Sequence, residues 1–62
     1  MRNGDRLMTL PEVLDELNIS RRTFYRWREL GRAPVCLQLP NDELRVWRSD
    51  LMAWLDSLRR AA

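Results

Sequence analysis

The sequence has no lysine and no histidine, and its 62 residues include a single cysteine and only two glycines. The absence of histidine removes the commonest general base and metal ligand, and the lone Cys36 has no partner for an internal disulfide. No apolar run approaches the roughly 20 residues that span a bilayer. These absences predict no metal site, no glycine-rich phosphate loop and no membrane segment.

The short length limits the class of protein further. A chain of this size buries only about 60% of its unfolded surface, so it builds one modest core without a deep pocket. We expect a single domain over residues 1–62, with no catalytic residues and no cofactor. The amino terminus has no signal-peptide pattern, which predicts a cytoplasmic protein. Cys36 is expected to be a small, half-buried strand residue.

All 11 basic residues are arginines, against nine acidic residues, and they are unevenly distributed. Residues 1–19 hold two arginines and four acidic residues, whereas residues 20–48 hold seven arginines and three acidic residues. The guanidinium fork suits phosphate and guanine contacts, although arginine-rich codon usage also explains the missing lysine. The middle of the chain is therefore the candidate surface for a polyanion.

Two short helices joined by a tight turn are predicted early in the chain. Thr9 and Glu12 have the spacing of a capping box, so a helix should begin at Leu10. Its apolar stripe consists of Leu10, Val13, Leu14 and Leu17. Asn18 tolerates the left-handed conformation that ends a helix, and Ser20 is a good N-cap for the next one. The spacing leaves a turn of three residues.

The second helix is predicted over residues 21–30, with Gly31 closing it. At about 100° per residue, Phe24 and Trp27 fall on one side and form its core face. The opposite side consists of Arg21, Arg22, Tyr25, Arg26 and Glu29. A solvated helix face ordinarily mixes charges of both signs, so this basic face predicts contact with nucleic acid.

A β-hairpin and a third helix are predicted to follow. Residues 35–39 and 44–47 have strand composition, and residues 40–43 have turn composition. Alternation predicts one face with Val35, Leu37, Leu39, Leu44 and Val46, and another with Cys36, Gln38, Arg45 and Trp47. Ser49 is the expected N-cap of the last helix. Its apolar stripe is Leu51, Trp54, Leu55 and Leu58, of which Trp54 and Leu58 should pack beside Trp27.

The order helix, tight turn, basic helix, hairpin and helix predicts a mainly α fold with a β-hairpin, the winged helix-turn-helix. A resemblance to a known family rests on three segments and four single residues. These are residues 9–13 (TLPEV), 18–27 (NISRRTFYRW) and 48–51 (RSDL), with Gly31, Pro34, Trp54 and Leu55. Over residues 7–58 the chain resembles the MerR-like small winged-helix family that includes phage excisionases. Asp42 and Glu43 depart from that family, whose wing tip is usually glycine-rich and basic.

The resemblance implies an excisionase-type recombination directionality factor, which binds and bends attachment-site DNA for an integrase. Expected partners are double-stranded DNA and the integrase, with no membrane. Major-groove contacts are expected from Arg21, Arg22, Tyr25 and Arg26. Contacts with the DNA backbone, or from the wing, are expected from Ser20, Thr23, Arg28, Arg32, Arg45 and Arg48. The alternatives are a small MerR-like transcription regulator of the same fold and a protein-interaction module that uses the hairpin and third helix.

Self-association on DNA is also expected, because one small recognition module binds DNA weakly alone. The alternation of the second strand puts Trp47 on its outer face, where a neighbouring copy can reach it. Asp42 and Glu43 would then face arginines of that copy. The competing interpretation is that Trp47 folds over the third helix as part of the core.

Overall fold

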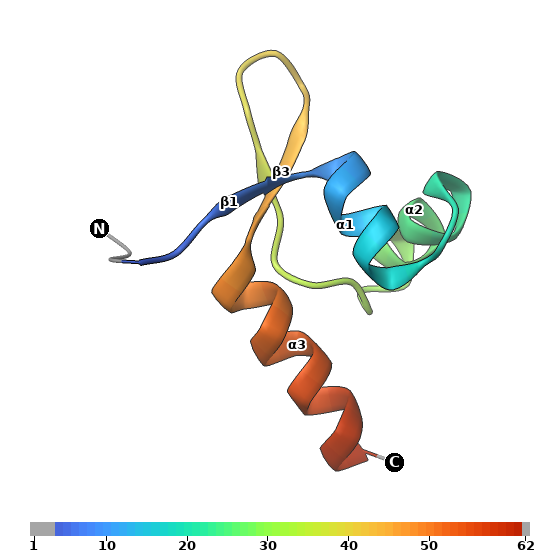
Figure 1. Ribbon diagram of the computed structural model, residues 1–62. Helices are drawn as coiled ribbons and strands as arrows, with labels where there is room; N and C mark the ends of the chain where they lie inside the picture. Colours follow the sequence, from blue (N-terminus) through green and yellow to red (C-terminus); the bar gives the residue numbers. More distant parts are fainter. Residues whose placement is uncertain (1–3, 62) are drawn as a thin grey trace.

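The computed structural model covers residues 4–61, and the side chains of residues 4–59, and it contains three helices and a small antiparallel sheet. The elements are β1 (Leu7–Thr9), α1 (Leu10–Leu17), α2 (Arg21–Glu29), β2 (Leu37–Gln38), β3 (Leu44–Trp47) and α3 (Arg48–Ala61). The β2–β3 hairpin projects away from the helices as a wing, and α1 and α2 lie to one side of it (Figure 1). The predicted winged helix-turn-helix is confirmed.

The predicted capping box begins α1. The Thr9 hydroxyl accepts a hydrogen bond from the Glu12 N–H at 3.2 Å, and the Glu12 carboxylate accepts one from the Thr9 N–H at 2.8 Å. At the other end Asn18 adopts the left-handed conformation, with φ of 55°. The Ile19 N–H then donates to the Leu14 carbonyl at 3.1 Å, which satisfies an end-of-helix acceptor. Residues 18–20 form the expected short turn.

The ends of α2 are fixed by local hydrogen bonds. Ser20 is the N-cap, and its hydroxyl accepts from the Thr23 N–H at 3.2 Å. Helix α2 ends at Glu29, one residue earlier than predicted, and Gly31 follows with φ of 70°. The N–H of Arg32 donates to the Trp27 carbonyl at 2.8 Å, the long bond of a Schellman motif. The position with positive φ explains why glycine stands there.

The sheet contains a strand that the sequence analysis did not predict. Its order is β1-β3-β2, with both pairs antiparallel, so β3 is central. Met8 of β1 lies opposite Val46 of β3. Both side chains are almost fully buried, so the three residues of β1 join the leader segment to the core.

The predicted faces of the hairpin were wrong for its first strand. Leu37 lies opposite Arg45, and Gln38 lies opposite Leu44. Directly opposed residues share a face, so Leu37 lies on the side away from the core, where it is 39% exposed. Val35 is 65% exposed, and Cys36 instead packs partly against the core. Leu39 is only half-buried, and β2 itself is limited to two residues.

The wing loop explains this shift of one residue. Leu39 and Glu43 are hydrogen-bonded across it, with the Leu39 N–H donating to the Glu43 carbonyl at 2.8 Å. The loop therefore contains residues 40–42, not 40–43, and Asp42 completes it in a left-handed conformation with φ of 68°. A register change of one residue moves every side chain of the strand to the other face. The predicted face holds for β3, whose Leu44 and Val46 are buried.

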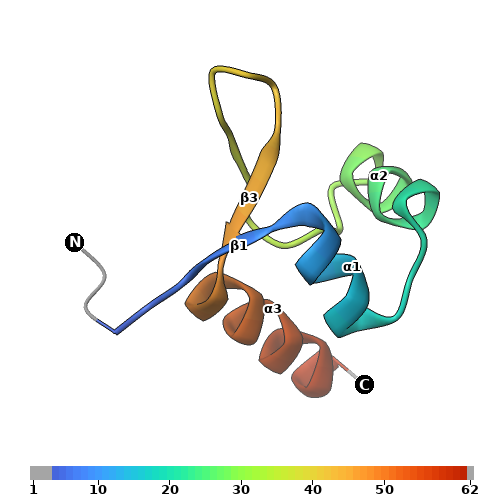
Figure 2. The same cartoon turned by 45° about the horizontal axis from the view of Figure 1, so that its top comes forward.

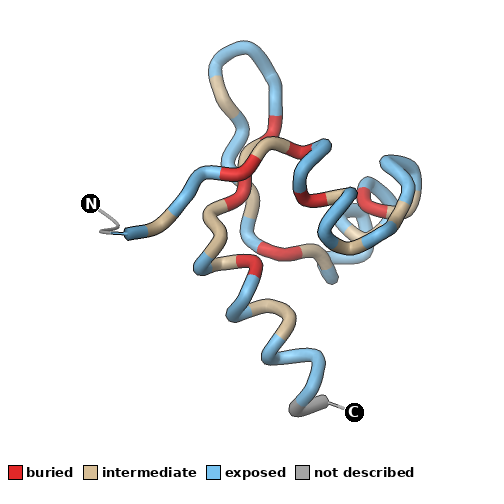
Figure 3. The backbone as a smooth tube through the Cα atoms, viewed as in Figure 1, coloured by how far each residue is buried: buried red, intermediate tan, exposed pale blue. Residues whose placement is uncertain are grey.

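The core lies where β3, β1 and the three helices meet (Figure 3). Its buried members are Met8, Leu10, Val13, Phe24, Leu44, Val46 and Leu51. Leu14 and Leu17 pack against this cluster but are only half-buried. Strand β2 contributes no buried residue, so the wing is held to the core by β3 alone.

Helix α3 begins at Arg48, directly after β3, and its cap differs from the prediction. Ser49 lies inside the helix and is not its N-cap. The carboxylate of Asp5 accepts hydrogen bonds from the Ser49 N–H at 3.1 Å and from its hydroxyl at 2.6 Å. Asp5 also accepts from the Arg6 N–H at 2.8 Å, and Arg48 N–H donates to the Arg6 carbonyl. A residue 44 positions earlier thus satisfies the start of α3.

The first half of α3 packs on the rest of the domain, and its exposed second half extends away from the sheet (Figure 1). In the view of Figure 2, α3 runs below α1. Leu51 is buried, and the Trp54 ring lies 5.9 Å from the Trp27 ring, as expected. The Trp54 indole N–H donates to the Arg32 carbonyl at 3.0 Å. Leu58 was expected beside Trp27, but it is 48% exposed, because the helix has left the core by that residue. No helix within residues 4–61 is long and apolar enough to cross a membrane.

Removing the Asp5 carboxylate should destabilise the domain. Asp5→Ala deletes the acceptors for the Ser49 N–H and hydroxyl, and the loss of a helix cap costs about 1 kcal/mol. In a domain of this size, that loss lowers Tm by roughly 4–8 °C. Asp15→Ala removes the same charge from an exposed position on α1 and should change Tm little. Equal losses of Tm in the two variants would contradict the capping role.

Replacing Trp54 should cost more than replacing Leu58, although both belong to the apolar stripe of α3. Trp54→Ala removes the contact with Trp27 and the bond to Arg32, at a cost of about 3 kcal/mol, the lower end for a tryptophan because the ring is half-buried. Leu58→Ala should cost less than about 1 kcal/mol. Urea unfolding of both variants measures the two costs, and a smaller loss for Trp54→Ala would show that α3 is peripheral.

Candidate nucleic-acid interface

The outward face of α2 has the residues that the periodicity predicted. Phe24 is fully buried and Trp27 half-buried, so together they hold the helix on the core. The side chains on the exposed side are Arg21, Arg22, Tyr25, Arg26, Arg28 and Glu29. A helix with one face fixed and a basic opposite face can enter the major groove of B-DNA, which is wide enough for one helix.

The arginines of α2 differ in their ion pairing from Arg6, Arg45 and Arg48, although Arg32 beyond the end of α2 also has no carboxylate within 4.0 Å among the described side chains. Three arginines outside α2 have a carboxylate within 4.0 Å: Arg6 with Glu12, Arg45 with Glu43, and Arg48 with Glu16. Within the described side chains, Arg21, Arg22 and Arg26 have no such partner. Their guanidinium groups are therefore available to an external anion without first breaking an ion pair.

Ser20 and Thr23 lie at the start of α2, and their hydroxyls contact each other. The two oxygens are 3.0 Å apart, and Ser20 also accepts from the Thr23 N–H. The pair positions the first turn of α2, whose backbone N–H groups carry the positive end of the helix dipole. Both residues thus lie beside Arg21 and Arg22 at the end of α2 that faces the wing.

Tyr25 and Arg28 form a second contact on the exposed side of α2. The Arg28 guanidinium carbon lies 5.9 Å from the centre of the Tyr25 ring, within cation–π range. The ring also meets Phe24 edge-on, with centroids 6.4 Å apart. This packing restricts the tyrosine, so its hydroxyl is presented from a defined direction beside the arginines.

Arg28 also lies near Cys36, the residue that precedes β2. Burial raises the pKa of the Cys36 thiol, and the Arg28 guanidinium offsets part of that effect. The thiol donates a hydrogen bond to the Pro34 carbonyl at 3.2 Å. A protonated, hydrogen-bonded thiol is a poor nucleophile, so Cys36 is a packing residue here.

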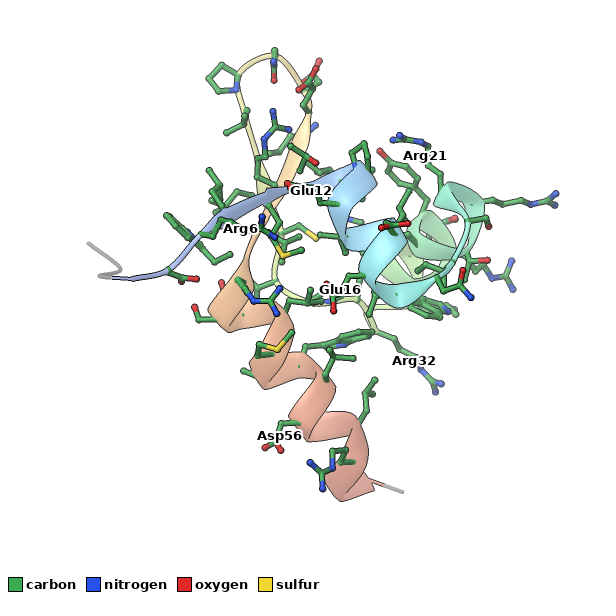
Figure 4. The ribbon with its side chains drawn as sticks, viewed as in Figure 1. Arg6, Glu12, Glu16, Arg21, Arg32 and Asp56 are labelled. Carbon is green, nitrogen blue, oxygen red and sulfur yellow. The ribbon has the colours of Figure 1, made fainter. Side chains whose placement is uncertain are left out.

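A groove of about 370 Å³ separates α2 from the wing. One wall is formed by Arg21 and Tyr25, and Figure 4 shows Arg21 at the edge of α2 near this hollow, with Arg32 at the opposite end. The residues of the other walls are Thr9, Leu10, Pro11, Asp42, Glu43, Leu44 and Arg45. A basic wall on α2 thus faces an acidic wing tip.

The structure does not bring Arg45 and Arg48 to α2 as free cations. Arg45 lies on β3, and its guanidinium is 3.0 Å from the Glu43 carboxylate. Arg48 is the first residue of α3 and lies 3.8 Å from Glu16 of α1. The first pair was not anticipated, although Glu43 and Arg45 are two residues apart and side chains at that spacing share a face of a strand.

The residues expected to support self-association lie on the wing and its base. Trp47 shares the outer face of β3 with Arg45, as the alternation predicted, and it is half-buried opposite Leu7 of β1. Asp42 is exposed and within 3.5 Å of the Gln38 amide. Among the described residues, no group of three histidines, cysteines or acidic residues is arranged to hold a metal ion.

Comparisons with known proteins identify the family. A search of curated proteins and a search of solved structures each found no match to the chain. A family model described as a helix-turn-helix domain matches residues 7–59, which span β1 to most of α3. That family includes excisionase-like small DNA-binding proteins, and its members are typically not enzymes. Since the match covers most of its length, this chain belongs to the helix-turn-helix domain family.

Proposed function

We propose that the protein binds double-stranded DNA sequence-specifically by placing α2 in the major groove. The observation that carries this proposal is the exposed face of α2, where Arg21, Arg22 and Arg26 lack ion-pair partners while Phe24 fixes the opposite face. An arginine fork matches the O6 and N7 acceptors of guanine. Arg22 and Arg26 are the proposed base readers, with Arg21 and Tyr25 beside them.

The proposed contacts with the DNA backbone come from residues at the two ends of α2. Ser20 and Thr23 lie at its start, and Arg28 and Arg32 lie at or beyond its last turn. Arg32 is exposed, and its carbonyl is fixed by Trp54, so the guanidinium projects from an anchored backbone. Arg45 and Arg48 are already engaged by carboxylates of this chain, and we leave them out of the proposed phosphate contacts.

Arg22→Ala and Arg26→Ala test the orientation of α2. Loss of a guanine contact should weaken binding by about 1–3 kcal/mol and relax the sequence preference at one base pair. The measurement is a mobility-shift titration against a selected site and its single-base variants. Arg59→Ala removes the same charge from the exposed second half of α3 and serves as the matched control.

The control separates base reading from a general loss of positive charge. The proposal expects Arg59→Ala to keep the wild-type sequence preference and most of its affinity. If Arg22→Ala and Arg26→Ala both behave like Arg59→Ala, α2 does not read bases and the proposed orientation is wrong.

We further propose that the protein acts as an excisionase-type recombination directionality factor, with an integrase as its partner. The resemblance over residues 7–58 and the membership of a family that includes excisionase-like proteins support this role. A single recognition helix buries only about 600–1,000 Å² on DNA, so several adjacent copies would be needed for discrimination. Trp47, Asp42 and Glu43 are the proposed surface for contact between neighbouring copies.

A small transcription regulator of the same fold is the second candidate. Its recognition helix would use the same arginines, so residues on α2 do not separate the two roles. The difference lies in DNA geometry: an architectural protein bends its site, at an elastic cost of roughly 1–6 kcal/mol for 20–30 base pairs. A regulator has no need for cumulative bending.

Duplexes carrying one, two and three adjacent sites test the architectural role. Contacts between neighbouring copies raise the effective concentration of the next copy, so affinity per site should rise with the number of sites. Circular-permutation gels should show a bend that grows in parallel, and Trp47→Ala should reduce the cooperativity on two sites without changing affinity for one. Independent binding without bending at all three lengths would favour the transcription regulator.

A further inference from the structure

Arg45 is the only basic residue between residues 33 and 47. Its guanidinium already forms an ion pair and a hydrogen bond within the wing. One of its terminal nitrogens lies 3.0 Å from the Glu43 carboxylate, and the other donates to the Leu44 carbonyl at 3.0 Å. The Arg45 side chain is 22% exposed, whereas that of Glu43 is 59% exposed. Glu43 is therefore the more exposed member of the pair, and an anion that approaches Arg45 meets the negative charge of Glu43 beside it.

A second carboxylate acts on the same guanidinium from α1. Arg45 lies opposite Thr9 in the sheet, and Thr9 holds the Glu12 side chain through the capping box. Hydrogen bonds from the backbone and then the side chain of Thr9 lower the pKa of Glu12, and the charges of Arg6 and Arg45 lower it further. Glu12 thus acts on Arg45 only through its charge, whereas the carboxylate that directly holds the guanidinium is that of Glu43.

The consequence concerns the groove between α2 and the wing. A DNA strand that follows α2 would pass Arg21 on one wall and the wing tip, with Asp42 and Glu43, on the other. A wing contributes to affinity when it presents a cation to a phosphate, because phosphate neutralisation supplies most of the sequence-independent binding energy. Here the cation that could do so is paired within the wing.

We propose that Glu43 holds Arg45 away from the DNA backbone, so that the wing adds no phosphate contact and sequence-independent affinity is kept low. Glu43 and Arg45 are then residues that set affinity and not readers of sequence. This inference rests on the proposed DNA binding through α2, and it assigns the wing a role in that site. The base-reading residues are unaffected, so the loss of Glu43 should strengthen binding to specific and random duplexes by similar factors.

Glu43→Gln tests the inference on a duplex with one site, where neighbouring copies play no part. The substitution removes the charge that holds Arg45, and one new phosphate contact should steepen the slope of log K against log salt by about 0.9. At 0.1 M salt that corresponds to roughly three- to tenfold tighter binding. Asp42→Asn removes the same charge from the same loop but frees no arginine, and asparagine tolerates the left-handed backbone at that position.

Arg45→Gln, alone and combined with Glu43→Gln, completes a double-mutant cycle for this ion pair. If Arg45 makes no phosphate contact in the wild-type protein, Arg45→Gln alone should leave the salt slope unchanged. The double variant Glu43→Gln with Arg45→Gln should lose the steeper slope of Glu43→Gln. Glu43 is exposed, so Glu43→Gln should leave the fold intact. A comparison of its Tm with that of Asp42→Asn checks this.

Three results would overturn the inference. A flatter salt slope for Arg45→Gln alone would show that Arg45 already contacts a phosphate. Equal gains for Glu43→Gln and Asp42→Asn would show that loss of negative charge acts at long range, without release of Arg45. An unchanged affinity for Glu43→Gln would show that the pair does not limit binding. A folded wild-type protein that binds no duplex at any salt concentration would instead overturn the proposed function itself.

Discussion

The antiparallel pairing of β1 with β3 is the constraint on which the arrangement of the domain depends. Helix α1 begins at Leu10, directly after β1, and α3 begins at Arg48, directly after β3, so neither helix has a linker in which to reorient. The buried Met8–Val46 pair therefore fixes both helix origins at once, and the Asp5 carboxylate adds a hydrogen-bonded connection between the two chain segments. Since α2 follows α1 after a short turn, and the wing shares β3, the spacing of α2 from the wing is set by the same ladder.

Charge pairing within the domain determines which face attracts an anion. Of the three acidic residues of α1, Glu12 pairs with Arg6 and Glu16 with Arg48, while Glu43 pairs with Arg45 on the wing. A net charge of only +2 is consequently compatible with a strongly positive recognition helix, because the neutralised arginines lie elsewhere. Exposed ion pairs contribute little to stability, so their principal effect here is on the distribution of the field.

Local sequence signals predicted the helix-turn-helix well, and non-local ones were missed. The capping box of Thr9 and Glu12 and the glycine that closes α2 act within a few residues, and each was found where the sequence placed it. Strand β1 was missed because three residues show too little alternation to distinguish them from a leader, and they become a strand only by pairing with β3. The wing register depends on Asp42 adopting a left-handed turn, which moved Leu37 outward, and the cap of α3 comes from Asp5, far away in sequence. Packing also determines which arginines form ion pairs. The sequence therefore predicted the basic face of α2, but it did not predict that Arg45 is paired while the arginines of that face are not.

Contacts at both ends hold α2 in place. This rigidity lowers the free-energy cost of the DNA binding proposed for α2, which matters in a protein with so small an interface. At its start the Ser20 cap and the short turn connect α2 to α1, and at its end the Arg32 carbonyl accepts from the Trp54 indole of α3. Phe24 fixes the rotation of the helix in between. Ordering a mobile helix on binding costs free energy that a small interface cannot easily recover, whereas a preorganised helix avoids that cost. The orientation of α2 therefore depends on α3, so under the proposed binding mode substitutions at the Trp27–Trp54 contact would alter DNA recognition from the side of α2 opposite its basic face.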